Sequence, residues 1–343
     1  MTCATAILGS SGYAGGELIR LVDAHPALDA VYLGAHRAAG ERLGAVHPHL
    51  GGGERVLGSL DPGEVPDVDL VFLALPHGTS AAPAMELLGR GAKVVDLGSD
   101  FRLDTPARYE SAYGMSHPFP DQLGAWAYGL PELHRSAIAR TDRVASPGCY
   151  PTSAILPLAP LLAEGLVEPT GIIVDAMSGV SGAGRGMRDD LHFGAVDESA
   201  KAYKVLQHRH QPEMERALDA VAAMTVQLIF TPHLVPMQRG ILTTIYARAG
   251  EGVTVDAVNG ALRSAYEQEP FVSIVEGSPE TRWVVGSNRA LVSAALDERS
   301  GTVVLISAID NLVKGAAGQA IQAANLMLGL DETAGLPLEG WMP

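Results

Sequence analysis

The sequence is short of positive charge and of long apolar runs. Its 343 residues hold 24 Lys and Arg against 39 Asp and Glu, a formal net charge of −15. Nucleic acids and anionic membranes are bound by clustered cations, so this balance argues against both as partners. No apolar run reaches about 18 residues, and the first nine residues lack the basic start and apolar core of a secretory signal. We expect a cytoplasmic protein.

Cysteine is also scarce. The two cysteines, Cys3 and Cys149, are far apart in the chain and too few for a disulfide scaffold, so both are expected as thiols. Apolar residues are plentiful, at 47% against 18% charged residues, which indicates a globular chain. Single cores seldom grow beyond about 250 to 300 residues, so the length indicates two domains.

The first part of the chain alternates short apolar strands with helical segments. The expected segments are 5–8, 13–25, 30–33, 70–75, 80–88 and 94–97. This alternation predicts an α/β fold, with a doubly wound, Rossmann-type parallel sheet over residues 1–148.

Beyond Pro151 the strands are longer and their connections irregular. Strands are expected at 172–176, 226–230, 241–247, 290–296 and 302–309. They predict a second α+β domain, residues 149–310, with a mixed and largely antiparallel sheet. A final helix within 311–330 is expected to join the first domain.

A glycine-rich turn follows the first strand. Gly9, Ser10, Ser11, Gly12, Tyr13 and Ala14 lie where a dinucleotide pyrophosphate meets a helix N-terminus. The spacing departs from Gly-x-Gly-x-x-Gly, so a tight turn without a ligand is the alternative. NAD-binding proteins usually have an acid after the second strand, which binds the ribose, but here His36 and Arg37 follow that strand. This favours NADP, whose 2′-phosphate Arg37 could bind. The alternative is that Arg37 is only a solvated surface charge.

Two segments supply a thiol and a base. Cys149 stands between Gly148 and a predicted helix, a setting that stabilises a thiolate, although a free cysteine can also be an inert buried residue. His208, His210 and Glu213 form a polar cluster that could serve the thiol. The cluster could also be an exposed turn, and a metal site is disfavoured because no ligand set is complete.

Cations that could bind an anionic substrate occur in two places. Arg185 and Arg188 lie in the glycine-rich loop 179–188, which could otherwise be a mobile linker. Arg102 follows the strand at 94–97, on the edge where open α/β sheets bind ligands.

These segments together resemble the N-acetyl-γ-glutamyl-phosphate reductases of the semialdehyde dehydrogenase superfamily, along nearly the whole chain. The residues that carry the resemblance are 9–15, 74–78, 100–102, 128–132, 147–152, 179–185, 208–213, 231–240 and 310–320. Their order and spacing agree throughout.

The resemblance implies roles for individual residues. Cys149 would be the nucleophile and His210 the acid/base, with Glu213 orienting His210 and His208 as its rival. NADP would contact Gly9 to Ala14, His36, Arg37, Leu75, Ser99, Ser181, Gly182, Asn311, Lys314 and Gly315. The substrate would meet Arg102, Arg185 and Tyr150. No metal is expected, and the broad second sheet makes a homodimer or homotetramer plausible.

The implied chemistry is reduction of an acyl phosphate. A thiolate can displace phosphate to give a thioester, which accepts hydride from NADPH where a carboxylate would not. Aspartate-semialdehyde dehydrogenase or the α-aminoadipate-pathway reductase would share this chemistry. A Cys-His hydrolase or a non-catalytic NADP sensor are alternatives of other classes.

Overall fold

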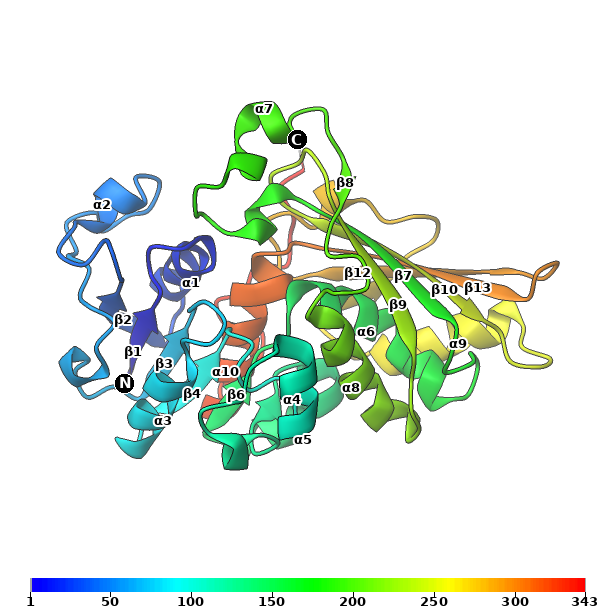
Figure 1. The fold of residues 1–343 in the computed structure, drawn as a ribbon, viewed down its shortest axis with the longest axis horizontal. Helices are drawn as coiled ribbons and strands as arrows, with labels where there is room; N and C mark the ends of the chain where they lie inside the picture. The colour runs from blue at the N-terminus through cyan, green and yellow to red at the C-terminus, as the bar shows by residue number, and fades with distance from the viewer. Residues whose placement is uncertain (1, 343) are drawn as a thin grey trace. The chain divides into compact units, whose positions relative to one another are not determined.

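A computed structural model describes residues 2–342 and divides into two compact units (Figure 1). The first unit contains the chain through Pro147 together with Ala316–Leu336. The second contains Gly148–Gly315 and the last residues from Pro337. The chain returns to the first unit within a π-helix, Val313–Ala317.

The first unit is built on a parallel sheet of six strands in the order β2-β1-β3-β4-β6-β5. Its strands are β1 (Cys3–Leu8), β2 (Leu28–Gly34), β3 (Leu70–Leu73), β4 (Lys93–Asp96), β5 (Ala127–Tyr128) and β6 (Arg143–Ala145). Its helices are α1 (Tyr13–Asp23), α2 (Leu43–Val46), α3 (Ala81–Gly89), α4 (Pro106–Tyr113), α5 (Pro131–Ile138) and α10 (Gly318–Leu328), with 3-10 turns at Pro62–Glu64 and Pro120–Gln122.

The central strands of this sheet are covered on both faces. All four residues of β3 are buried, and an apolar core that includes Ala6, Leu73 and Val94 joins the strands to their helices. Because a strand buried on both faces must be apolar throughout, the run at 70–73 is continuous rather than alternating. Helix α10 packs against α5, α1 and β4.

The second unit is built on a seven-stranded mixed sheet in the order β11-β12-β13-β10-β7-β9-β8. Its strands are β7 (Ile172–Ser178), β8 (Lys201–Ala202), β9 (Leu228–Leu234), β10 (Ile241–Arg248), β11 (Val272–Ile274), β12 (Ala290–Asp297) and β13 (Thr302–Ile309). Its helices are α6 (Cys149–Ala163), α7 (Phe193–Val196), α8 (His210–Ala222) and α9 (Val255–Tyr266), with 3-10 turns at Val180–Ala183, Asp189–Leu191 and Thr281–Trp283.

Helices α6, α8 and α9 cover one face of this sheet, as Figure 1 shows. Helix α6 lies at the centre and is almost entirely buried, although it contains Pro157 and Pro160. A proline cannot donate to the carbonyl four residues before it, which leaves the Ser153 and Leu156 oxygens without a helical donor. The Ser307 hydroxyl donates to the Ser153 oxygen at 2.6 Å, and the Tyr266 hydroxyl donates to the Leu156 oxygen at 2.5 Å. The helix therefore keeps its interior prolines because β13 and α9 supply the missing donors.

The expected fold class is confirmed for both sheets. Four of the six strand pairings in the second sheet are antiparallel, and the β7–β9 and β11–β12 pairings are parallel. Some elements were not expected from the sequence. Strands β5, β8 and β11 are only two or three residues long and show no measurable alternation. Helix α8 begins at His210, so the polar cluster extends into its first turn.

Candidate active site

Cys149 is the first residue of α6. Gly148, at φ −68° and ψ 156°, precedes it as an N-cap that provides no side chain. First-turn amides of a helix have no intrahelical acceptor, and the positive end of the helix dipole favours a thiolate there. A Cβ on Gly315 would lie 2.7 Å from Cys149 Cβ, so only glycine lets the 310–315 turn approach the thiol this closely.

Helix α8 brings two members of the polar cluster beside this turn. The buried Glu213 accepts a hydrogen bond from the Gly148 amide at 2.8 Å through Oε1. Its other oxygen lies 3.9 Å from His210 Nε2. One carboxylate thus fixes the backbone next to Cys149 and faces the imidazole of His210. Helices α6 and α8 pack together, which holds this arrangement in place.

His208 has a different environment from His210. Burial, reinforced by the nearby Lys204 and Arg209 cations, lowers the pKa of His208 to about 4. Its Nδ1 accepts a hydrogen bond from the His210 amide at 3.2 Å. A histidine with that pKa is neutral at pH 7 and gives a thiolate no cationic partner, so the geometry favours His210 as the acid/base.

Cys149 and both histidines line one cavity of about 350 Å³ in the second unit. Tyr150 and Tyr203 also line it, with their hydroxyls 3.0 Å apart. Burial raises the pKa of both phenols, that of Tyr203 to about 12, so they are neutral hydrogen-bonding groups. The Tyr150 hydroxyl is further engaged with the His233 carbonyl at 3.4 Å.

Sequence reasoning missed most of the charged lining of this cavity. The lining includes four cations and one carboxylate: Arg188, Lys201, Lys204, Arg209 and Asp190. Arg188 lies in the glycine-rich loop that was expected to bind an anionic substrate, whereas Arg209 lies in the polar cluster and was given no role. Tyr203, Lys201 and Lys204 showed no signal, since they lie in a stretch with no recognisable motif.

The two arginines chosen as anion ligands belong to different units. Arg102 is buried in the first unit and donates through Nη2 to the Leu97 carbonyl at 2.7 Å. Arg185 is exposed on the loop after the Val180–Ala183 turn and is absent from the described lining of the thiol cavity. The assignment of Arg102 and Arg185 to the substrate therefore stays a prediction.

The glycine turn in the first unit is shaped for close backbone approach. Gly9 has φ +95°, and a Cβ there would lie 2.3 Å from the Ala74 oxygen. Gly12 is the N-cap of α1 and offers no side-chain cap, and no acid occupies the helix's first turn. Ser10 shapes this turn, because its hydroxyl donates to the Ile7 carbonyl at 2.7 Å and its amide to the Gly34 carbonyl. Since β2 pairs with β1, the segment after Gly34 that carries Arg37 begins beside this turn.

Two further cofactor candidates follow β3 and β4. Leu75 is nearly buried, and Ser99 Oγ lies 2.8 Å from His77 Nδ1. The segment from Leu97 to Arg102 is held by two carboxylates, Asp96 and Asp100. Burial and the neighbouring Asp100 raise the pKa of Asp96 to about 7. Burial opposes ionisation of Asp100, but hydrogen bonds from His77 and from the Gly78 and Ser80 amides lower its pKa to about 2.

The remaining cofactor candidates belong to the second unit. Asn311 donates to Ser181 Oγ at 2.9 Å and accepts from the Gly240 amide at 2.8 Å, so it ties two loops together. A Cβ on Gly182 would lie 2.9 Å from Ser178 Oγ. Lys314 is fully buried, with Nζ 5.6 Å from the centre of the Phe271 ring.

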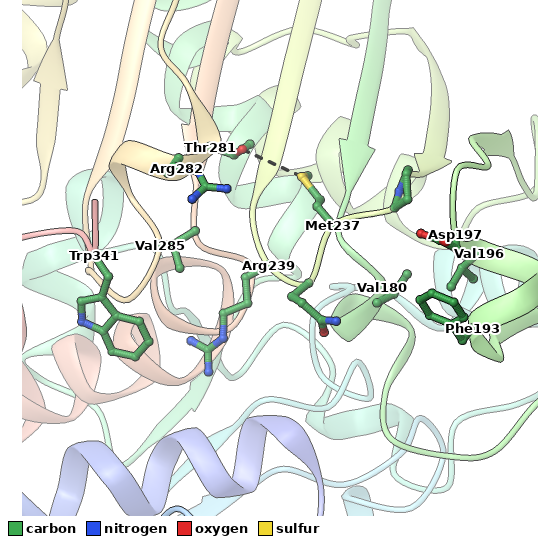
Figure 2. Close-up of a pocket in the computed structure, with 12 residues that line it drawn as sticks. Val180, Phe193, Val196, Asp197, Met237, Arg239, Thr281, Arg282, Val285 and Trp341 are labelled. Carbon is green, nitrogen blue, oxygen red and sulfur yellow. Dashed lines mark hydrogen bonds between the residues drawn. The ribbon is translucent and has the colours of Figure 1, made fainter. Parts of the chain in front are cut away.

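A larger cavity of about 570 Å³ in the same unit lacks the thiol (Figure 2). Figure 2 shows Arg239 beside Trp341 on one side and Phe193 on the other. The Arg239 guanidinium carbon lies 5.9 Å from the centre of the Trp341 ring, and the side chain is also held by Asp310 at 3.3 Å. Because its described lining residues include neither a cysteine nor a histidine, we assign the chemistry to the smaller cavity.

Residues 2–342 contain no group of three or more His, Cys, Asp or Glu side chains placed to hold a metal ion. Within the same range, the helices all lack the length and hydropathy needed to cross a membrane.

Two family models together match most of the chain. The model for the semialdehyde dehydrogenase NAD-binding domain matches residues 4–141, and the model for the semialdehyde dehydrogenase dimerisation domain matches residues 149–311. Among solved structures, aspartate semialdehyde dehydrogenase II from Vibrio cholerae has a TM-score of 0.73 and 18% identity, covering 96% of this chain and 99% of that one. At that identity the likeness shows the fold alone.

Curated relatives are much more similar in sequence. The N-acetyl-γ-glutamyl-phosphate reductase of Desulforudis audaxviator is 47% identical, over 98% of this chain and 99% of the relative. The enzyme of the same name from Acidothermus cellulolyticus is 48% identical over the whole of both chains. With a thiol, a histidine and a carboxylate gathered at the start of α6, and with this similarity over its full length, the chain belongs to the N-acetyl-γ-glutamyl-phosphate reductase family of semialdehyde dehydrogenases.

Proposed function

We propose that this protein reduces N-acetyl-γ-glutamyl phosphate to the semialdehyde, with release of phosphate and with Cys149 as the nucleophile. The observation that carries the proposal is the position of Cys149 at the N-terminus of α6, in a cavity shared with His210 and directly after Gly148, whose amide donates to Glu213. The test is NADPH consumption with N-acetyl-γ-glutamyl phosphate, compared with aspartyl phosphate and α-aminoadipyl phosphate. Faster consumption with either rival would contradict the proposed substrate.

The side chains of the cavity have different roles in the reaction. Cys149 attacks the acyl carbon, the acyl–oxygen bond to phosphate breaks, and a thioester forms on Sγ. His210 takes the thiol proton and later gives it to the thiohemiacetal oxygen formed by reduction, or to the departing sulfur. Glu213 stabilises the protonated imidazole across 3.9 Å. First-turn amides of α6 are placed to stabilise the oxyanion.

The nicotinamide cofactor supplies the hydride that reduces the thioester. The turn from Gly9 to Gly12 fits a pyrophosphate, because its glycines have no side chains in the way and α1 begins there without a side-chain cap. We propose that Arg37 and His36 select NADPH through its 2′-phosphate. The described segment after β2 has no acid before Glu41 to bind a ribose hydroxyl.

Reversing the charge at Arg37 tests this selection. Arg37→Asp is expected to weaken NADPH binding by about 1 to 3 kcal/mol, the scale of a charge-assisted hydrogen bond, and to leave NADH binding nearly unchanged. Fluorescence titration of both nucleotides measures the two dissociation constants. Arg42→Asp is a matched control, since Arg42 is 67% exposed and pairs with Glu54. Equal affinity of the unaltered protein for NADPH and NADH would remove this interpretation.

We also propose that the second unit forms a homodimer through the uncovered face of its sheet. Ile173, Met177, Ile229 and Tyr246 lie there on adjacent strands, each between 39% and 49% exposed. Apolar side chains gathered on one face are typical of an interface. Sedimentation at micromolar concentration should give twice the chain mass of 35.8 kDa, and Ile229→Asp should shift the protein to monomer. A monomer in both cases would contradict the proposal.

A further inference from the structure

Two cations of the thiol cavity are held by one carboxylate. Arg188 donates to Asp190 through Nε at 2.9 Å and through Nη2 at 2.8 Å, the two-pronged geometry in which arginine binds carboxylates. Lys201 donates to Asp190 Oδ2 at 3.1 Å and to its carbonyl at 3.3 Å. All three residues line the cavity that contains Cys149.

Arg188, Asp190 and Lys201 come from two elements, a loop and a strand, which hold their backbones in place to different degrees. Lys201 lies on β8, which pairs with β9 opposite Leu234, another lining residue. Arg188 caps the short 3-10 turn that contains Asp190, so the arginine and its carboxylate come from one loop. The backbone of Lys201 is therefore fixed by the sheet, whereas Asp190 belongs to a loop whose side chains can rearrange.

The Asp190 pairs are exposed enough to be exchanged. The side chains of Arg188, Asp190 and Lys201 are 56%, 45% and 40% exposed. Ion pairs in such positions contribute little to stability, so a competing carboxylate can replace Asp190 at small cost. The Arg188 guanidinium, followed by the Lys201 ammonium, holds the pKa of Asp190 below its usual value, so the resident group is an anion at neutral pH.

The proposed substrate carries a second anion besides its acyl phosphate, an α-carboxylate at the end of the molecule that does not react. We propose that Arg188 and Lys201 recognise this α-carboxylate, and that Asp190 holds their donors until the substrate displaces it. The inference rests on the proposed function. The phosphate of the substrate would then be bound by the other two cations of the same cavity, Lys204 and Arg209.

The experiment compares two acyl phosphates on each variant. One is N-acetyl-γ-glutamyl phosphate, and the other is the same molecule with hydrogen in place of the α-carboxylate. Arg188→Gln should lower kcat/KM for the first about 10- to 100-fold, mainly through KM, because a two-pronged charged hydrogen bond is lost. Its kcat/KM for the second should change less than about threefold. Lys201→Gln should show the same selective loss to a smaller degree.

Other variants separate this assignment from its rivals. Asp190→Asn should lower KM for the carboxylated substrate about threefold, since the resident competitor loses its charge, and should leave the second substrate unaffected. A rise in KM for both substrates would overturn the displacement of Asp190. Arg299→Gln is the charge-matched control, because Arg299 is 88% exposed on the β12–β13 hairpin and should not change the ratio of the two kcat/KM values.

The outcomes that overturn the assignment differ from those that overturn the proposed function. Equal loss on both substrates in Arg188→Gln would place Arg188 at the phosphate or in the fold. Selective loss in Arg185→Gln instead of Arg188→Gln would move the carboxylate site to Arg185. If the unaltered protein consumes no NADPH with N-acetyl-γ-glutamyl phosphate, the proposed function fails and the assignment fails with it.

Discussion

Cys149→Ser is expected to lose reduction by at least about 10⁴-fold, the scale seen when a covalent nucleophile is removed. Serine is not ionised near pH 7, and an oxygen ester accepts hydride less readily than a thioester. Nicotinamide binding should persist, because Cys149 lies at the start of α6 and not in the glycine turn of the first unit.

Trapping the acyl-enzyme makes this test decisive. Incubation with the acyl phosphate, without NADPH, should release phosphate and add the acyl mass to the peptide that contains Cys149. Cys3→Ser is the matched control, since burial raises the pKa of the Cys3 thiol and so lowers the share of reactive thiolate. Normal turnover without any adduct on Cys149 would show that catalysis is not covalent at this residue.

His210→Asn is expected to reduce kcat by about 10²- to 10⁴-fold, the usual contribution of a positioned acid/base. The residual rate should rise as pH increases, because the unassisted thiol of Cys149 must ionise by itself. A pH profile of kcat/KM between pH 6 and about 9 measures both effects.

The neighbouring histidine provides the control for that experiment. Its pKa of about 4 keeps His208 neutral across this pH range, so His208→Asn should retain the pH profile of the unaltered protein. Loss of the profile in His208→Asn, with His210→Asn unaffected, would leave Cys149 as the nucleophile and exchange the roles of the two histidines.

Local sequence patterns correctly predicted the elements whose conformation depends on neighbouring residues alone. The apolar run at 70–73, the glycine turn before α1 and the glycine before Cys149 each predict their own backbone, and the structure has these elements. The strand at Thr302–Ile309 has the bounds that the sequence predicted. The short β8 has no such pattern, because pairing with β9 rather than sequence makes it a strand.

The charged lining of the thiol cavity could not be predicted in the same way. Lys201 and Asp190 are eleven residues apart and meet only because the loop between them returns to the sheet edge. Arg185 and Arg188 look equivalent in the sequence, and only the three-dimensional arrangement places Arg188 in the cavity. The choice between His208 and His210 as the acid/base likewise depends on how deeply each imidazole is buried and on the charges near it. A sequence motif contains neither kind of information.

The two interior prolines of α6 bear on the order of folding. The carbonyl oxygens of Ser153 and Leu156, which lack donors within the helix, accept hydrogen bonds from distant residues. Ser307 is 154 positions from Ser153 in the chain, and Tyr266 is 110 positions from Leu156. Closing such long loops is slow compared with forming local contacts. We therefore expect α6 to be completed only after β13 and α9 have formed and docked against it. We also expect the Cys149 thiol to reach its environment at the end of this helix only once the second unit has assembled.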